Sequence, residues 1–323
     1  MTKQNDSVTP QSRGDKLGAR TRFLTSANVL FLALIAISEL LPNATLEDPC
    51  SLYLYVVAGG VFAIQFIACA IVRKRATRNS FTDVSSVILS VLLVWLVLTA
   101  KFNVLPTKMF PAPGIVFAQI VADYAKILEG IGSSLSIIAE GFMLGGVSAI
   151  LIGLALGFNA RVNSCTERIV SFLAAIPPIV YIPYGIALLP TFKASSILVI
   201  FLATFWPVLT GTLAGVSNVD ERAINSARVL NVKTPTMLGR IMLPSALPLI
   251  FNGLNIGLTL SFILLTSAEM IGGKSGMGYY VKYYSDFGDY TRILAGIIVI
   301  GVVITIISLL FAKAQKRLTH WKQ

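Results

Sequence analysis

Residues 220–244, with the sequence DERAINSARVLNVKTPTMLGRIMLP, form a polar segment between two long apolar runs, and this segment decides the fold of the chain. The flanking runs, residues 194–218 and 241–268, are uncharged. Each is longer than the roughly 20 residues that a helix needs to cross a bilayer. The polar segment is therefore predicted to be a loop that connects two membrane-spanning helices.

The first half of this loop has the pattern of a short helix. Ala223, Ala227 and Leu230 are spaced i, i+4 and i+7, which predicts that they share one face. Asp220 and Glu221 stand at the start, where the positive end of a helix dipole favours acids.

The second half predicts a tight turn followed by another helix. Asn231 tolerates the left-handed conformation that ends many helices. Thr234 and Pro235 fit an N-cap and a first helical residue, and the new helix is expected to continue into the next span. The loop is predicted to be helix, tight turn and helix.

At these residues the chain resembles the membrane subunit of ABC importers. In that family a cytoplasmic loop has Glu-Ala-Ala, three residues, Gly, nine residues, Ile, one residue and Leu-Pro. The spacing is kept here by Asn225-Ser226-Ala227, Asn231 and Ile241-Met242-Leu243-Pro244, with Asn225 in place of the glutamate and Asn231 in place of the glycine.

Flanking motifs are similar to the nitrate/sulfonate/taurine/bicarbonate branch of that family, and the resemblance runs from about Pro111 to the C-terminus. These motifs are Ala175-Ile176-Pro177-Pro178, Ile182-Pro183, Phe205-Trp206-Pro207, Ser245-Ala246-Leu247-Pro248, Ala268-Glu269-Met270 and Gly276-Met277-Gly278-Tyr279. The resemblance implies the permease subunit of an ATP-driven importer, forming the translocation pathway for a small solute such as nitrate, sulfonate, taurine or bicarbonate.

The resemblance also implies the partners of the chain. These are ABC ATPase subunits, an extracytoplasmic solute-binding protein and a second permease copy, most simply in a homodimer. The chain itself is expected to have no catalytic residue and no cofactor, with ATP and Mg bound by the ATPase. The coupling loop is assigned to residues 219–244, and the residues expected to dock the ATPase are Glu221, Arg222, Asn225, Ser226, Ala227, Arg228, Asn231 and Pro235.

Composition independently predicts an all-α integral membrane protein. Of the 323 residues, 55% are hydrophobic and only 13% are charged, which is too apolar for an ordinary soluble domain. The net charge of +11 is the difference between 26 lysines and arginines and 15 acids, and the basic residues cluster between apolar runs. This is the positive-inside pattern of a protein in a lipid bilayer, and it does not indicate nucleic-acid binding.

The apolar runs predict about eight transmembrane helices in the cell (inner or plasma) membrane, with both termini cytoplasmic. They are residues 23–41, 52–72, 84–100, 131–158, 169–190, 194–218, 241–268 and 293–312. Residues 1–22 are predicted to be a cytoplasmic tail, residues 23–80 two extra helices, and residues 81–323 the permease domain, whose last six helices form the importer core. Residues 115–128 are expected to form an amphipathic helix at the outer surface.

Three prolines and two acids are candidates for the translocation pathway. Pro177, Pro178 and Pro183 must interrupt the fifth span, and a membrane tolerates freed carbonyls only beside neighbours or a cavity. Glu140 falls inside the fourth span, where it is either a pathway residue or a neutral acid hydrogen-bonded between helices. Glu269 closes the seventh span, where it contacts substrate or the binding protein, or is a solvated helix end.

Other chemical signals are weak. Residues 268–275, AEMIGGKS, fit a relaxed phosphate-loop pattern, but they follow a membrane span rather than a parallel strand, so ATP binding is not expected. Cys50, Cys69, Cys165 and His320 lack disulfide or metal spacing, so no metal site is predicted. Tyr279, Tyr280, Tyr283, Tyr284 and Tyr290 suggest an interfacial belt rather than a binding cage. An ion-gradient-driven secondary transporter and a non-transporting membrane scaffold remain alternatives, and co-purification with an ATPase would separate them.

Overall fold

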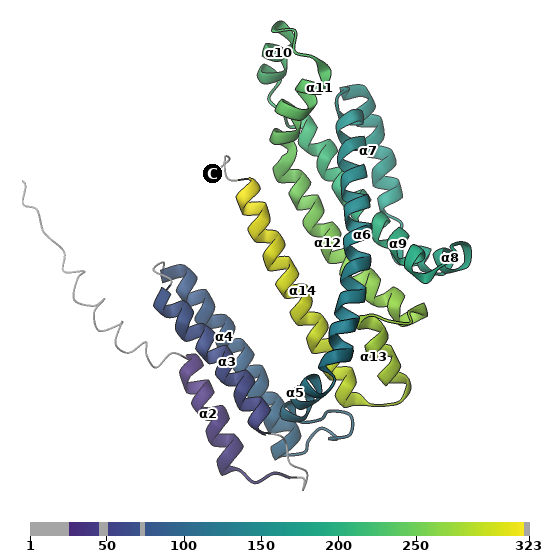
Figure 1. Cartoon of the computed structure of the whole chain (residues 1–323). Helices are drawn as coiled ribbons and strands as arrows, with labels where there is room; N and C mark the ends of the chain where they lie inside the picture. The colour runs from purple at the N-terminus through teal and green to yellow at the C-terminus, as the bar shows by residue number, and fades with distance from the viewer. Residues whose placement is uncertain (1–25, 45–50, 72–74, 320–323) are drawn as a thin grey trace, which may run out of the picture. The chain divides into compact units, whose positions relative to one another are not determined.

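The computed structural model describes residues 26–44, 51–71 and 75–319, and every regular element in these ranges is helical (Figure 1). This confirms the predicted all-α fold. The predicted tail, residues 1–22, lies outside the described residues, as do Cys50 and His320.

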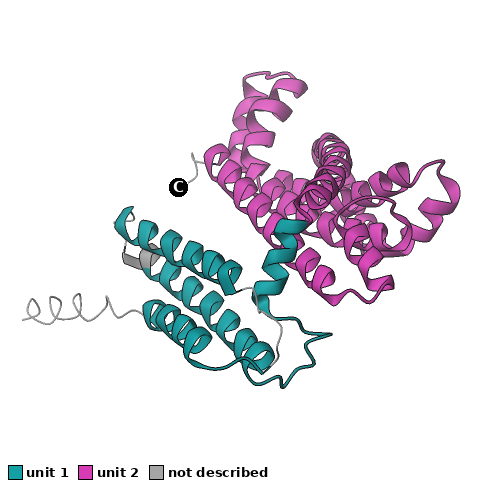
Figure 2. Cartoon of the chain, turned by 60° about the horizontal axis from the view of Figure 1, so that its bottom comes forward, with its two compact units in different colours: residues 1–122 teal, residues 123–323 magenta. Residues whose placement is uncertain are grey.

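The chain divides into two compact units, residues 1–122 and 123–323 (Figure 2). The boundary predicted between residues 80 and 81 stays a prediction, and those two residues lie within one helix, α4.

The first unit contains α2 (Ser26–Leu40), α3 (Ser51–Ile71), α4 (Arg75–Leu96) with a π-helical end η2 (Val97–Lys101), and α5 (Pro113–Ala122). Lys101 is only 7% exposed. Its ammonium donates to the carbonyl oxygens of Ser38 at 2.6 Å and Leu41 at 2.7 Å, and to Asn43 Oδ1 at 2.8 Å. A cation at this position satisfies acceptors that the end of α2 leaves free, so it fastens α2 to α4.

The second unit contains α6 (Tyr124–Gly157), α7 (Ala160–Ala174), η3 (Pro178–Val180), α8 (Tyr181–Leu188), α9 (Phe192–Ser217), α10 (Glu221–Val229), α11 (Thr234–Met237), η4 (Leu238–Met242), α12 (Leu243–Gly272), α13 (Met277–Asp286) and α14 (Tyr290–Leu318). The α6, α9, α12 and α14 helices are its long elements (Figure 1).

Six helices in the described residues are long and apolar enough to cross a membrane: Ser51–Ile71, Asn79–Lys101, Tyr124–Gly157, Phe192–Ser217, Thr234–Gly272 and Tyr290–Leu318. The α7 and α8 helices, bent by 59° at a break, make a seventh span if they are taken as one. The α2 helix has 15 residues, fewer than the roughly 20 that a span requires. The predicted number of eight is therefore not confirmed.

Two boundaries differ from the sequence-based expectation. The region 115–128 is not one amphipathic helix, because α5 ends at Ala122 and α6 begins at Tyr124, seven residues before the expected start of that span. Residues 159–168, which separate the expected fourth and fifth spans, are not a loop, because α7 begins at Ala160 and contains Arg161, Glu167 and Arg168. This helix starts there because the Asn159 side chain accepts a hydrogen bond from Arg161 N at 3.0 Å, which is an N-cap.

Small residues bring α6, α9 and α12 into close contact. A Cβ added at Gly145 of α6 would lie 2.7 Å from the Phe201 carbonyl oxygen of α9, and one at Gly253 of α12 would lie 2.5 Å from that of Pro207. Such contacts let helix backbones approach closely in lipid. The order of contacts along the chain makes α6 and α9 parallel and α12 antiparallel to both, as the predicted alternation of spans requires.

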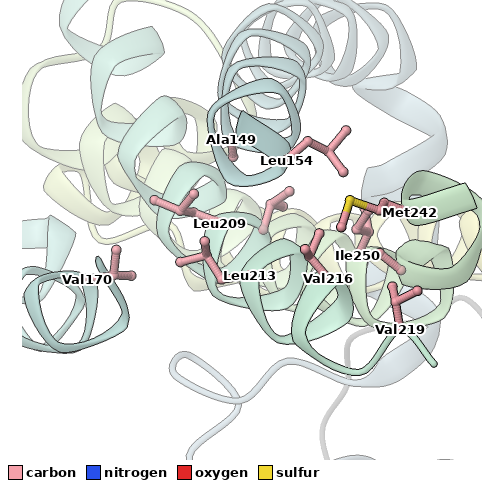
Figure 3. Packing of buried hydrophobic residues seen from close by; sticks show 11 residues of the cluster. Ala149, Leu154, Val170, Leu209, Leu213, Val216, Val219, Met242 and Ile250 are labelled. Atoms are coloured by element: carbon pink, nitrogen blue, oxygen red, sulfur yellow. The ribbon is translucent and has the colours of Figure 1, made fainter. Parts of the chain in front are cut away.

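A hydrophobic core lies between these three helices (Figure 3). Ile224 of α10 and Leu238 of η4 pack against it. Leu154 of α6, Leu213 and Val216 of α9, and Ile250 of α12 are each at most 8% exposed there. Met242, at the end of η4, completes the packing.

Candidate functional site

Residues 220–244 form the helix, tight turn and helix that the sequence predicts. Asp220 Oδ1 accepts from Arg222 N at 2.8 Å and starts α10. The α10 helix ends at Val229, and Asn231, two residues later, has a left-handed φ of 53°. Val232 N donates to Ala227 O and Asn231 N to Arg228 O, both at 3.0 Å, which is the double hydrogen bond of a left-handed helix end.

The second helix continues into the membrane span, as expected. Helical structure is continuous from Thr234 to Gly272. The N-cap is Lys233 rather than Thr234, so Pro235 is the second helical residue and not the first. A shift of one residue at a helix start is common, because helix ends fray.

The buried side of α10 contains only one of the three residues that were predicted to share a face. Ala227 is 4% exposed and Ile224 packs against the core, whereas Ala223 is exposed and Leu230 is 76% exposed. Leu230 is the last residue before the left-handed turn, which carries the chain away from the face that Ala227 occupies. Ala227, one of the expected docking residues, therefore anchors α10 inward.

The other expected docking residues present a free surface. Arg222, Asn225, Ser226 and Arg228 are exposed, and their side chains have no hydrogen-bond partner within the described part of the chain. Val229, 81% exposed, and Leu230 add apolar area beside them. We call this surface, together with the exposed Glu221, Asn231 and Pro235, the α10 surface. Unpaired cations and amides next to exposed apolar side chains are typical of a surface that another protein covers.

Near the C-terminal end of α12, Glu269 is buried, and both of its carboxylate oxygens accept hydrogen bonds from other helices. It is 1% exposed. Its Oε1 accepts from Ser134 Oγ of α6 at 2.6 Å and its Oε2 accepts from Gly278 N of α13 at 2.7 Å. Ser134 Oγ in turn accepts from Met277 N at 2.9 Å. Glu269 is therefore not a solvated residue at a helix end. Its role in the translocation pathway stays a prediction.

A second polar cluster that the sequence did not suggest lies on the α13 side of the unit. Asp123 Oδ2 accepts from Tyr280 OH at 2.9 Å and from Arg292 Nε at 2.7 Å. Burial and the Asp123 carboxylate raise the pKa of Tyr280, so this phenol stays protonated and donates. Tyr280 is 7% exposed, whereas Tyr283 and Tyr290 are 43% and 39% exposed, so only some of the tyrosines could line an interface.

Glu140 has a cationic partner. Lys193 Nζ lies 2.5 Å from Glu140 Oε1, and the two side chains are about half exposed. Lys193 is the second residue of α9, so Glu140 lies beside the end of the neighbouring span rather than at its middle. Glu140 itself lies within α6 (Tyr124–Gly157), inside the fourth span as expected, and its role in the pathway stays a prediction.

The three prolines do interrupt the fifth span. Pro177 precedes η3, Pro178 is its first residue, and Pro183 lies in the first turn of α8. A cavity of about 340 Å³ opens between η3, α9 and α12. Pro178 lines it, whereas Pro177 and Pro183 are not among the lining residues. Its polar lining comes from Trp206, Thr210 and Asn252.

The AEMIGGKS segment does not have the setting of a phosphate loop. Residues 268–272 are the end of α12, Gly273 is its C-cap, and no strand occurs in the residues that the structure describes. Across the same residues, no cluster of three potential metal ligands occurs.

Most of the second unit matches a known protein family. Residues 141–320 match the family described as the binding-protein-dependent transport system inner membrane component. The chain belongs to this family. The match covers α9, the α10–α11 segment and α12, as well as the proline-interrupted span.

Individual relatives agree with this membership. A probable ABC transporter permease protein of Brucella abortus (strain 2308) is 33% identical over 231 residues, 71% of this chain and 91% of the relative. The taurine transport system permease protein TauC of Escherichia coli (strain K12) is 32% identical, covering 61% of this chain and 72% of TauC. The nitrate import permease protein NrtB of Leptolyngbya laminosa is 29% identical, covering 54% and 62%.

This protein is therefore the permease subunit of an ABC importer and a multi-span protein of the inner membrane. Membership implies an ATPase and a solute-binding protein as partners, and ATP hydrolysis belongs to the separate ATPase subunit. The family gives no support to an ion-gradient-driven secondary transporter.

Proposed function

We propose that this permease subunit imports a small solute bearing an oxyanion group, and that the α10 surface is where its ATPase docks. The observation that carries the docking proposal is the contrast within α10. Ala227 and Ile224 hold the helix to the core, while Arg222, Asn225 and Arg228 project outward without internal partners. A rigid base with an unpaired outer face is suited to receive force from another protein.

The route of that force follows the chain. The α10 helix is joined to α9 by three residues, 218–220, and to α12 through the continuous helix Thr234–Gly272. Because glycines pack α6, α9 and α12 backbone to backbone, movement of α10 would shift the three helices together. Alternating access follows, with no bond made or broken by this chain.

The substrate class is taken from relatives named for taurine and nitrate transport. Taurine carries a sulfonate, and nitrate is itself an oxyanion. We further propose a homodimer in the lipid bilayer with both termini cytoplasmic. We also propose that this chain binds no cofactor, and that ATP and Mg are bound by the partner ATPase.

Docking is tested with the double variant Arg222→Glu plus Arg228→Glu. Reversing two exposed charges at a protein interface replaces attraction by repulsion, so we expect ATPase co-purification to fall by about tenfold or more. Lys274→Ala is the matched control, because Lys274 is an exposed cation beyond the other end of α12. It should retain full co-purification and coupled ATP hydrolysis. Unchanged association of the double variant would contradict docking at the α10 surface.

Orientation is tested with reporters fused after Val219, between α9 and α10, and after Gly288, between α13 and α14. The first fusion should be cytoplasmic and the second external, because lysines and arginines are concentrated in the inside segments. An external reporter after Val219 would place the α10 surface out of reach of any cytoplasmic ATPase.

A further inference from the structure

Two amide side chains are exposed on α12 in the part of the chain that crosses the membrane. Asn252 lies near the middle of the 39-residue helix Thr234–Gly272, and Asn255 lies one turn further on. Neither amide has a hydrogen-bond partner within the described part of the chain. An unpaired polar group facing hydrocarbon costs several kcal/mol, so lipid is not what covers this face of α12.

Asn252 also lines the cavity between α9, α12 and η3, whereas Asn255 is not among the lining residues. Across the cavity from α12, α9 contributes Thr210 and Pro207. Pro207 has no N–H, so the usual helical hydrogen bond from residue 207 to the carbonyl oxygen of Ala203, another lining residue, is absent. The Thr210 hydroxyl donates to Trp206 O at 3.0 Å and keeps its lone pairs as acceptors. The amide of Asn252 is therefore the one lining side chain with two N–H donors to offer.

The cavity suits transient passage of a small solute. Its volume of about 340 Å³ is at the lower end of small-molecule sites. No charged residue lines it, so a solute would be held by hydrogen bonds and not by a full opposite charge. Conduction requires binding that is strong enough to enter and weak enough to leave. Its walls, α9 and α12, are also the two helices joined to α10, so a movement there would change the shape of the cavity.

We propose that this cavity is a solute-contacting part of the translocation pathway, and that the Asn252 amide donates a hydrogen bond to an oxygen of the passing oxyanion. The inference rests on the proposed oxyanion import and adds the site at which this chain meets the solute. A second copy of the chain packed over the same face is the competing occupant.

The first test measures water access in the assembled complex with its ATPase and binding protein, reconstituted in liposomes. Cys50, Cys69 and Cys165 are replaced by Ala, and Asn252→Cys is treated with the charged thiol reagent 2-sulfonatoethyl methanethiosulfonate. The thiolate forms in water and not in an apolar environment, so Asn252→Cys should react about tenfold or more faster than the control Leu309→Cys. Leu309 is 65% exposed on α14, whose surface is almost wholly apolar. Taurine or nitrate at high concentration should slow the reaction at residue 252.

Equal reaction rates at residues 252 and 309 would overturn the proposal. So would efficient oxidative cross-linking of Asn252→Cys between two copies without reaction with the reagent, because the second copy would then cover this face.

The second test compares Asn252→Leu with Asn255→Leu. Loss of one donor in the pathway should slow uptake about two- to tenfold, and Asn252→Asp should slow uptake of an anion further through repulsion. Asn255→Leu should transport normally. ATPase co-purification should be unchanged in all three variants, which separates this proposal from docking at the α10 surface. Normal uptake by Asn252→Leu would overturn the proposal. Uptake slowed equally in both leucine variants would also overturn it, because the loss would then belong to the polar face and not to the cavity.

Discussion

Polar side chains near the two ends of α12 differ in whether they have partners within the chain. At one end, Arg222, Asn225 and Arg228 of the α10 surface are exposed and have no internal hydrogen-bond partners in the described residues. At the other end, both carboxylate oxygens of Glu269 accept hydrogen bonds from other helices, and the side chain is 1% exposed. A polar side chain with buried partners holds the fold together, whereas one without them is available to another molecule.

The same contrast separates two acids that the sequence grouped together. Glu269 joins three helices, α6, α12 and α13, and its neighbours would be left unpaired without it. Glu140 pairs with Lys193 of α9, and both side chains are about half exposed, so loss of Glu140 would leave no buried group without an acceptor. Substitutions can therefore be ranked by what each would leave without a partner.

The largest expected effect is that of Glu269→Ala. The change leaves Ser134 Oγ and Gly278 N buried without their acceptor, which should lower the free energy of unfolding by about 2–5 kcal/mol. The fall in the midpoint of thermal unfolding in detergent measures it. Glu221→Ala, at an exposed position of the α10 surface, is the control and should leave the midpoint almost unchanged. If the unfolding midpoints of the two variants fell by similar amounts, Glu269 would be no more important for stability than an exposed residue of the α10 surface.

A smaller change in the free energy of unfolding is expected from a glycine-to-alanine substitution in α12, compared with the same substitution in η4. In Gly253→Ala the new methyl group would lie 2.5 Å from the Pro207 carbonyl oxygen, so α9 and α12 must separate at a cost of about 1–3 kcal/mol. In Gly239→Ala, in η4, the methyl group meets no atom within 4 Å. That variant should be neutral or more stable by about 0.5–1 kcal/mol, because alanine favours a helix over glycine. Equal unfolding midpoints would mean that the close contact of α9 and α12 does not constrain the unit.

The smallest effect on stability is expected at Asn231. Substitutions there should change mainly the coupling between this subunit and its ATPase. Its φ of 53° costs an ordinary side chain about 1–2 kcal/mol, so Asn231→Val should re-aim the second helix and weaken ATPase association by about tenfold. Asn231→Gly, which accepts this conformation without strain, is the matched control. A pull-down and a coupled-transport assay measure both. If the valine and glycine variants behaved alike, the left-handed turn would not position the α10 surface.

What the sequence determined by itself was local in origin. Runs of apolar residues predicted the long helices, because a bilayer selects helices by length and hydropathy alone. The positions where helices start, turn or break were predicted from Asp220, Asn231 and the three prolines, because caps and prolines act on the backbone within a few residues. The helix-turn-helix at residues 220–244 and the interrupted fifth span were therefore predictable.

Only the tertiary structure decided which residues face each other. In the sequence, 135 positions separate Ser134 from Glu269, and 53 positions separate Glu140 from Lys193. No local sequence pattern therefore predicts either pair. Ile224, and not Ala223, became the inward side chain of α10 because the core beneath it is built by other helices. The place of Asn252 in a cavity, with Asn255 outside it, likewise depends on where α9 and η3 lie against α12. Helix formation is set by neighbours in the chain, whereas partner, depth and exposure are set by neighbours in space.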